Sequence, residues 1–346
     1  MTPLAGGEPL PLSTASDRDA AARRPAFGAP LVGPDGRPGP VAAVVVTHDG
    51  IDAVRACVAS LRASRGVDLF TIVVDNASRP ENRAIIEREL GGLPDVELVF
   101  LAENRHFAGG VNAGAERAIA RGAGFLFILN DDTEIAPDCV AMLVESAVRH
   151  PDAGLVGPAL LDVHERDRAL SLGERYSTWS LAVPRSLLRV RDPGDGTPYR
   201  VGGIMGSAVL VTRECFLRTG PYREDLLVYY EEVDFCLRAR RLGFRPLLVP
   251  RAVVRHDGMR GYASGLTPYA ARLKTRNQVI LVRDHGSLAE KVAFAPIFLA
   301  LVGASAVLYA ARGERDVVRA LRDGVADGLR AVSRPREPLP APEPRR

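Results

Sequence analysis

The chain has 346 residues, of which 47% are hydrophobic and 25% are charged, and its formal net charge is +3. These values are ordinary for a globular protein, and the length allows one large domain or two small ones. So small a positive charge argues against a nucleic-acid-binding protein.

Residues 1–40 are rich in proline and glycine and lack apolar periodicity, so we expect a disordered tail. They contain no basic segment followed by an apolar one, so we expect no signal peptide.

Strands and helices alternate from Val41 onward. This order requires right-handed crossovers and predicts a mostly parallel, Rossmann-like α/β sheet with helices on both faces. Beyond about residue 153 the pattern loosens into short strands and loops, with helices at 231–242 and 268–284. In the first half, strands are expected at 41–47, 69–75, 96–101 and 125–130, and helices at 51–64, 81–90, 108–121 and 137–149.

Residues 292–311 form a run of about 20 residues without a charge, which is long enough to span a bilayer. After a span, the arginine-rich helix that follows would lie outside the cytosol, against the positive-inside tendency. We therefore favour a helix in the cytosolic leaflet, with the arginines on lipid headgroups. A buried helix in a dimer or domain interface is the alternative. The arginines are Arg312, Arg315, Arg319, Arg322 and Arg330.

The four cysteines form no C-x-x-C pair and no short disulfide framework, so we expect reduced thiols in the cytosol. They are Cys57, Cys139, Cys215 and Cys236.

Polar residues end each of the first four predicted strands. The carboxyl ends of parallel strands share one edge of the sheet, and ligands bind there in open α/β folds. One such aspartate is often a helix cap, but four polar ends exceed what capping explains. Clustered carboxylates repel one another unless a divalent cation is present, and oxygen ligands favour Mg²⁺ or Mn²⁺ shared with substrate phosphates. These ends are Thr47-His48-Asp49, Asp75-Asn76-Ala77-Ser78, Glu103-Asn104-Arg105 and Asn130-Asp131-Asp132-Thr133.

Several strings resemble family 2 glycosyltransferases, in particular the rhamnosyltransferase-like bacterial members. The first half contains V-V-D-N-A-S (73–78), E-N-R-H-F-A-G-G-V-N-A-G (103–114) and F-I-L-N-D-D-T (127–133). The second half contains G-S-A-V-L-V-T-R-E-C-F (206–216), Y-Y-E-E-V-D-F-C-L-R (229–238) and V-P-R-A-V-V-R-H (249–256). The resemblance spans 41–285 and implies an A-type glycosyltransferase fold. It also implies inverting, metal-dependent transfer of a sugar from a nucleoside diphosphate to an acceptor hydroxyl.

The resemblance also implies roles for the donor-side residues. Asp75 would bind the nucleobase, with Thr47 and Asp49 lining the same pocket, and Asp131 would lie near the ribose and diphosphate. Asn76, Asn104 and Asn112 complete the expected nucleotide-sugar-binding set. For the small residues at 109–114, close approach to a phosphate and tight helix–sheet packing are both open.

For the metal, the resemblance implies Asp132 as a ligand of Mg²⁺ or Mn²⁺, with His256 as a further metal or diphosphate contact. A hydrogen-bonded surface histidine is the alternative for His256.

Three acids in four positions open the helix at 231–242. Direct displacement at a sugar needs a base to take the acceptor proton, and the resemblance implies Glu232 for that role. Asp234 and Arg238 would position the acceptor or the base, with Glu231 on the acceptor side. Glu231 as the base, and acids that only stabilise the helix N-terminus, are the alternatives.

Two departures from the family pattern concern binding. The first strand ends in T-H-D-G instead of T-Y-N, and Arg223 stands where an aspartate is expected. They leave the nucleobase contacts and the acceptor loop less defined.

The predicted organisation has a nucleotide-sugar-binding half (41–150), an acceptor half (151–285), membrane-associated helices (286–332) and disordered tails (1–40 and 333–346). We expect dTDP-rhamnose or a UDP-sugar as donor and a polyprenyl-linked or cell-envelope glycan as acceptor. The expected location is the cytoplasmic face of the cell membrane, and a homodimer is compatible with this organisation.

Other function classes fit less well. A nucleotidyltransferase needs a glycine-rich basic loop after the first strand, and a dinucleotide oxidoreductase needs G-x-G-x-x-G there. The sequence at that place is T-H-D-G-I-D. A non-catalytic nucleotide-sugar-binding or membrane scaffold protein would be expected to lose the acids that are present here.

Overall fold

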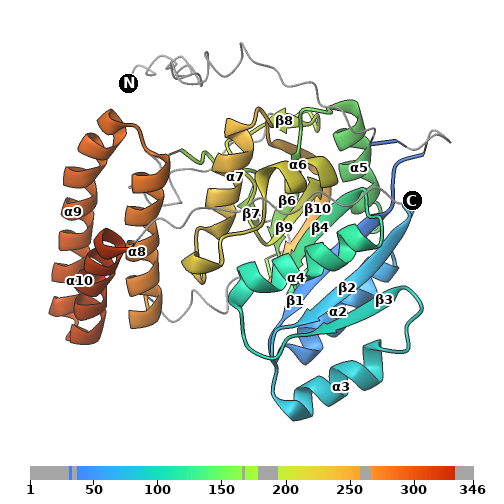
Figure 1. The fold of residues 1–346 in the computed structure, drawn as a ribbon, viewed down its shortest axis with the longest axis horizontal. Helices are drawn as coiled ribbons and strands as arrows, with labels where there is room; N and C mark the ends of the chain where they lie inside the picture. Colours follow the sequence, from blue (N-terminus) through green and yellow to red (C-terminus); the bar gives the residue numbers. More distant parts are fainter. Residues whose placement is uncertain (1–30, 33–36, 166–167, 178–193, 258–265, 332–346) are drawn as a thin grey trace, which may run out of the picture.

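A computed structural model describes residues 31–32, 37–165, 168–177, 194–257 and 266–331 (Figure 1). The tails predicted at 1–40 and 333–346 lie outside the described residues, apart from 31–32 and 37–40.

The described part of the chain is built around a ten-stranded mixed sheet with the strand order β3-β2-β1-β4-β9-β6-β10-β5, with β7 and β8 attached to β6 and β10. The first four of these strands run parallel, as the sequence predicts: β1 (Val41–Thr47), β2 (Leu69–Asp75), β3 (Val96–Phe100) and β4 (Phe125–Asn130). The others are β5 (Thr133–Ile135), β6 (Leu155–Asp162), β7 (Ala169–Ser171), β8 (Tyr199–Arg200), β9 (Ala208–Thr212) and β10 (Leu247–His256).

The antiparallel strand β9 joins the two halves of the sheet. It pairs with β4 on one side and β6 on the other, and β10 runs parallel to β6. The carboxyl end of β10 therefore reaches the region where β4 ends, and β5, directly after β4, pairs antiparallel with β10 from Ile135 to Thr133. Residues at the ends of β4 and β10 become neighbours through this topology.

Helices cover both faces of the sheet (Figure 1). Residues 42, 44 and 46 of β1 pack in the same cluster as α4, and residues 41, 43 and 45 pack in the same cluster as α2. This two-sided burial explains the unbroken apolar run of β1. The helices around the sheet in the described residues are α2 (Ile51–Arg62), α3 (Pro80–Leu90), α4 (His106–Ala120), α5 (Cys139–Arg149), α6 (Arg213–Thr219) and α7 (Glu231–Arg241), with a short 3₁₀ turn η3 (Glu224–Leu226).

The small residues of α4 let this helix lie close to the sheet. A Cβ atom on Gly110 would stand 2.5 Å from Cγ1 of Val46, and one on Gly114 would overlap Val44. These contacts favour the packing interpretation of these two glycines.

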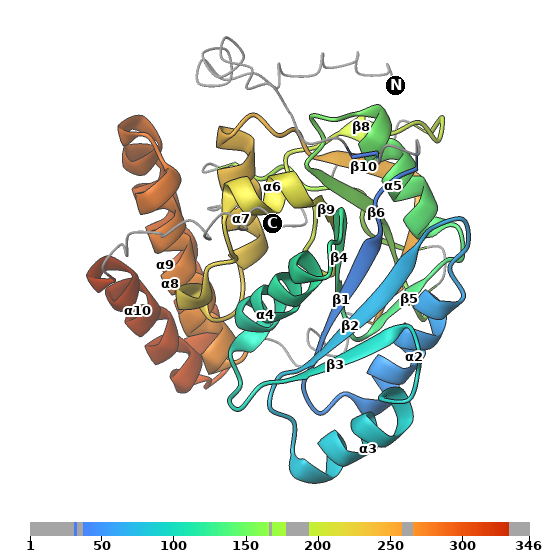
Figure 2. The same ribbon diagram turned by 45° about the vertical axis from the view of Figure 1, so that its right-hand side comes forward.

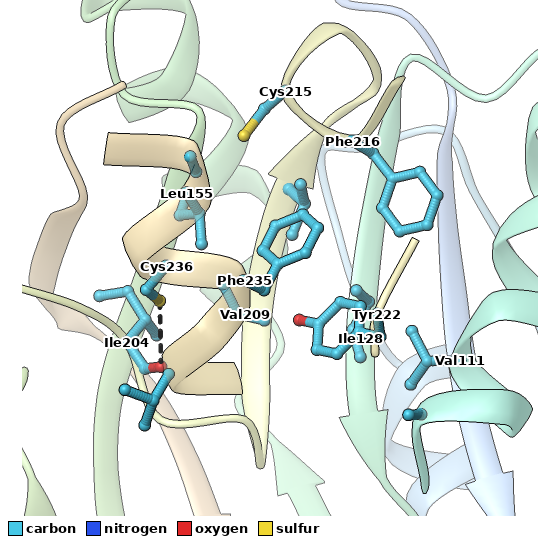
Figure 3. Packing of buried hydrophobic residues seen from close by; sticks show 14 of the residues in the cluster. Val111, Ile128, Leu155, Ile204, Val209, Cys215, Phe216, Tyr222, Phe235 and Cys236 are labelled. Carbon is cyan, nitrogen blue, oxygen red and sulfur yellow. Dashed lines mark hydrogen bonds between the residues drawn. The ribbon is translucent and has the colours of Figure 1, made fainter. Parts of the chain in front are cut away.

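A hydrophobic cluster packs α7 against the sheet. The ring of Phe235 stacks on Tyr222 with a centroid distance of 4.6 Å and lies 5.9 Å from Phe216. Figure 3 shows these rings beside Val209 of β9 and Ile128 of β4. Since α7 begins with the acids of the candidate site, this packing determines where those acids lie.

Three C-terminal helices stand side by side at one edge of the molecule: α8 (Pro268–His285), α9 (Leu288–Ala311) and α10 (Arg315–Arg330) (Figure 1 and Figure 2). The backbones of α10 and α8 lie close together at Gly328. A Cβ atom on this glycine would stand 2.9 Å from the carbonyl oxygen of Arg276. Val317 and Leu321 of α10 also pack in a cluster with Val302 of α9. Thus α10 contacts both other helices.

Candidate active site

Thr47 and Asp131 connect the ends of β1 and β4. The Thr47 hydroxyl donates a 2.6 Å hydrogen bond to Oδ2 of Asp131. Gly50 approaches the same carboxylate so closely that a Cβ atom there would overlap Oδ2. Burial raises the pKa of Asp131 to about 6, and the neighbouring Asp132 carboxylate adds to this rise, while the Thr47 hydrogen bond opposes it. A nearby cation would stabilise the ionised form of Asp131.

Asp132 and His256 meet at the junction of β4, β5 and β10. Nε2 of His256 lies 3.1 Å from Oδ1 of Asp132 and 3.3 Å from the side-chain nitrogen of Asn130. The Asp132 atom is buried, and no aligned hydrogen bond reaches it among the described residues. The imidazole is 11% exposed and the Asp132 side chain 33% exposed, so the pair borders on solvent.

This pair fits a divalent cation that is also bound by a ligand. A carboxylate oxygen without a donor and a neighbouring imidazole nitrogen are both metal-ligand types. No group of three or more His, Cys, Asp or Glu side chains arranged for a metal occurs in the described residues. Mg²⁺ is typically held by one or two carboxylates together with substrate phosphates and water, so the remaining ligands would come from those sources.

Asp75 ends β2 with a buried carboxylate that is 1% exposed. Its Oδ1 accepts a 3.3 Å hydrogen bond from the amide of Ser78, whereas its Oδ2 has no hydrogen-bond partner in the described structure. A buried acceptor without a donor is costly, so Oδ2 is suited to the N–H group of a bound molecule.

Asp49 holds the loop between β2 and α3. Its Oδ1 accepts hydrogen bonds from the amide of Arg79 at 2.9 Å and from the side chain of Asn82 at 2.8 Å. The same contacts, the Arg79 amide first, hold the pKa of Asp49 below its usual value. Its carboxylate is therefore bonded within the protein, and the predicted contact of Asp49 with a nucleobase is not supported.

Asn76 and Asn104 hold the loop between β3 and α4. The Asn76 side chain donates to Oδ1 of Asn104 at 3.0 Å and to the carbonyl of His106 at 2.8 Å, and it accepts from the amide of Arg105 at 2.9 Å. Oδ1 of Asn104 also accepts from the amide of His106 at 2.8 Å. These bonds hold the loop in place and use both polar atoms of the Asn76 side chain and the oxygen of Asn104.

Asn112 ties α4 to the loop before α7. Its side chain exchanges hydrogen bonds with the backbone of Tyr222 at 2.8 and 3.0 Å and donates to Glu224 at 3.0 Å. Arg105 forms a 2.6 Å ion pair with the same glutamate. Asn112 is thus placed between the two halves of the domain, and the expected donor contact by its amide is not supported.

Glu232 lies in the first turn of α7 and is 8% exposed. The hydroxyl of Tyr176 donates to it over 3.4 Å, and a Cβ atom on Gly206 would stand 3.1 Å from its Cβ. Ser207, next to Gly206, accepts a 3.1 Å backbone hydrogen bond from Asn130. Since Asn130 contacts His256, these short links bring Glu232 and the Asp132–His256 pair to the start of β9.

Asp234 and Arg238 belong to a buried ionic network. Asp234 is fully buried and pairs with Arg238 at 2.6 Å and with His285 of α8 at 2.8 Å. Arg238 also donates to the carbonyl of Pro221 at 2.8 Å and to that of Thr219. This placement does not support direct contact of Asp234 or Arg238 with an acceptor, because both side chains are directed into the protein. They hold the turn before α7.

Arg223 joins this network instead of facing an acceptor. It forms ion pairs with Asp225 at 2.6 Å and with Asp284 at 2.8 Å, and its side chain is only 7% exposed. The arginine that replaces the expected aspartate therefore fastens its loop to α8.

Sequence reasoning missed two neighbours of the site, Gly206 and Tyr176, and placed Asn130 at the polar edge without a role of its own. Asn130 directly precedes Asp131 and Asp132, and Gly206 begins one of the quoted strings, which was the available signal for each. Tyr176 lies in an irregular segment, and no local pattern marks it.

The sequence and fold match known proteins. Residues 42–206 match Glycosyl transferase family 2. This match covers just under half of the chain, which is similar to family 2 glycosyltransferases over these residues. The chain is similar to a dTDP-rhamnosyl transferase, RfbF, of Shigella flexneri, with 22% identity over 209 residues that cover 60% of this chain and 66% of that protein. This coverage is just under two thirds of the relative.

A second relative is an N-acetylglucosaminyl-diphospho-decaprenol L-rhamnosyltransferase of Mycobacterium tuberculosis. It is 26% identical over 248 residues, which cover 65% of this chain and 78% of that protein. With the family match, these relatives identify the enzyme class as glycosyltransferase, in agreement with the sequence prediction.

Two solved structures share the A-type glycosyltransferase fold. GalNAc-T7, crystallised with UDP, GalNAc and Mn²⁺, aligns with a TM-score of 0.55 and 17% identity over 74% of this chain and 53% of that chain. S. aureus TarS 1–349 aligns with a TM-score of 0.51 and 13% identity over 75% of this chain and 70% of that chain. The predicted fold class is confirmed.

Proposed function

We propose that this glycosyltransferase moves a sugar from a nucleoside diphosphate donor to an acceptor hydroxyl with inversion at the anomeric carbon. The observation that carries the proposal is the approach of Asp132 to His256, with Glu232 linked to the same place through Gly206 and Asn130. A single displacement needs a base for the acceptor hydroxyl and stabilisation of the leaving group, and this arrangement of side chains fits both needs.

The donor is held on the first half of the domain. The free Oδ2 of Asp75 accepts a hydrogen bond from a nucleobase N–H, and Asp131 lies near the ribose and diphosphate. Asp132 and His256 would hold Mg²⁺ or Mn²⁺, which would supply positive charge to stabilise the leaving diphosphate. Mn²⁺ with UDP in GalNAc-T7 supports this choice of ion.

Glu232 acts as the base. Its carboxylate accepts the acceptor hydroxyl proton while the acceptor oxygen attacks the anomeric carbon and the bond from that carbon to the diphosphate oxygen breaks. Tyr176 orients the carboxylate through its 3.4 Å hydrogen bond. Glu231 occupies the acceptor side of the same helix turn. No covalent sugar–enzyme bond is needed in this sequence of events.

The test is the pair Glu232→Gln and Glu231→Gln, measured by release of nucleoside diphosphate and by product formation. We expect Glu232→Gln to lower kcat by about 10²- to 10⁴-fold, the usual contribution of a general base. Glu231→Gln should stay within about tenfold of the unchanged protein. The opposite ranking would move the base to Glu231, and full activity in both would remove the base from this helix.

The donor and acceptor classes follow from the relatives. The names of the Shigella and mycobacterial proteins support dTDP-rhamnose as the first donor to test, followed by UDP-sugars, and a polyprenyl-linked glycan as the acceptor class. A panel of nucleotide sugars, scored by the nucleoside diphosphate released, distinguishes these donors.

The cytosolic face of the membrane is the proposed location, with the outer face of α9 in the lipid. This helix is long and apolar enough to cross a membrane. An 18-residue stretch of it has a mean hydropathy of 2.2, and 11% of that stretch is buried. Val292, Leu299 and Val307 are 67%, 58% and 71% exposed. Exposed apolar surface of this extent indicates an interaction site.

The packing of α10 supports a helix that lies in one leaflet and does not span the bilayer. If α9 spanned, α10 would start on the far side, yet α10 packs along α8, which is anchored to α7 by the His285–Asp234 pair. The arginines of α10 offer less positive charge to lipid headgroups than the sequence suggests. Arg319 forms an ion pair with Asp316, and Arg322 forms one with Asp323.

Two variants test this location. Leu299→Glu should release the protein from membranes without lowering activity on a soluble acceptor analogue, whereas Arg88→Glu on exposed α3 should not. Glu314→Cys, at the turn before α10, should react with an impermeant maleimide from the same side as Glu81→Cys. Labelling from opposite sides would show that α9 spans.

A further inference from the structure

The segment between η3 and α7 has an unusual backbone. Leu227, Tyr229 and Tyr230 have φ angles of 64°, 71° and 70°, in the left-handed region that side chains other than glycine rarely adopt. Tyr230 is the N-cap of α7, and no side chain caps this helix N-terminus. The strained segment therefore sets the start of α7, and Glu232 follows within one turn.

Asn277 of α8 holds this segment. It is fully buried, and its side-chain nitrogen lies 2.9, 3.1 and 2.9 Å from the carbonyl oxygens of Leu226, Val228 and Tyr229. Three carbonyl oxygens so close in sequence can point at one nitrogen only if the backbone turns sharply between them. The Asn277 amide therefore stabilises the left-handed conformations of this segment.

Arg276 orients this amide. Its guanidinium donates to Oδ1 of Asn277 at 2.8 Å and to the carbonyl of Asp225 at 3.0 Å. The Asn277 oxygen is thereby occupied, which turns the nitrogen toward the loop. Both residues come from α8, outside the part of the chain that matches the family.

We propose that Asn277 is a positioning residue, which fixes the 226–230 loop and through it the carboxylate of Glu232. This inference rests on the proposed role of Glu232 as the base. It assigns α8 a part in catalysis besides its packing in the C-terminal bundle.

The test compares Asn277→Asp, which keeps the shape but replaces the donor with an acceptor, against Thr275→Ala. Thr275 is buried on the same helix and faces α10 at Gly324, so its loss weakens the bundle without touching the loop. We expect Asn277→Asp to lower kcat by about 10²-fold, the effect of a displacement of about 1 Å, with the donor KM unchanged. Thr275→Ala should lower Tm but leave kcat unchanged.

A double-mutant cycle decides whether Asn277 acts through Glu232. In the Glu232→Gln background, Asn277→Asp should cause little further loss, because contacts that act on one group are not additive. If Asn277→Asp lowers kcat as much in the Glu232→Gln background as in the unchanged protein, the inference about Asn277 is wrong while Glu232 remains the base. The same conclusion follows if the Asn277→Asp variant is as active as Thr275→Ala. Full activity in Glu232→Gln would overturn the base and the inference with it. If Asn277→Asp does not fold, Arg276→Met should show a smaller loss of kcat in the same direction, and unchanged kcat there would count against the proposal.

Discussion

The imidazole of His256 lies 3.1 Å from the carboxylate of Asp132, although one ends β10 and the other follows β4. The pairing of β5 with β10 creates this approach, because it lays the chain after β4 against the end of β10. The arrangement has consequences that can be measured.

Loss of either partner should weaken metal dependence. In Asp132→Asn and His256→Ala we expect the Mn²⁺ concentration for half-maximal activity to rise by at least about 10-fold, since even changes to outer-shell partners cost 10- to 100-fold in affinity. Activity of the unchanged protein should vanish in excess chelator and return with Mg²⁺ or Mn²⁺. An unaltered metal titration in both variants would exclude this pair as the ligands.

Gly50 should be required for the position of Asp131. In Gly50→Ala the added methyl group displaces the Asp131 carboxylate and breaks its hydrogen bond with Thr47. We expect a higher donor KM and a stability loss of about 1 kcal/mol for that bond. Gly92→Ala is the matched control, because a Cβ atom there meets nothing within 4 Å. Equal donor KM in the two variants would contradict the prediction.

Asp49→Asn should destabilise the protein in a pH-dependent way. The folded-state pKa of Asp49 is below its ordinary value of 3.8 because the Arg79 amide and Asn82 bind the charged form. The Asp49 carboxylate therefore stabilises the folded protein above about pH 4, and this stabilisation disappears as the pH falls through the folded-state pKa of Asp49. Denaturant unfolding should show a difference between variant and unchanged protein at pH 7 that shrinks at pH 3. Asparagine tolerates the φ of 60° at this position, so a difference independent of pH would refute the charge explanation.

The four cysteines should be unreactive in the folded protein. All are buried, and burial raises the pKa of the Cys57 and Cys236 thiols to about 12 and those of Cys139 and Cys215 further. Because the thiolate is the reactive form, a thiol reagent should label none before unfolding and four in denaturant. Rapid labelling of any of them under native conditions would mean that the local packing opens.

Much of the donor half could be predicted from the sequence. The apolar runs of β1, β2 and β4 and the alternation with helices determine a parallel sheet, and its geometry places Thr47, Asp75 and Asp131 at one edge. The same reasoning predicted that Asp49, Asn76 and Asn112 bind the nucleotide sugar. In the structure their side chains form hydrogen bonds with other residues of the protein. Residue type and position do not reveal whether a polar side chain already has partners.

What the sequence alone determined is the parallel half of the sheet and the location of its polar edge, because these follow from local periodicity and strand direction. The choice of acids came from the family resemblance. Tertiary structure decided which partners each acid has. Asp234 pairs with Arg238 and His285 in the interior, while Glu232, two residues earlier, lies beside Gly206 and accepts a hydrogen bond from Tyr176. Helix rotation and long-range packing of α7 against α8 separate these two carboxylates, and no local sequence pattern encodes that difference.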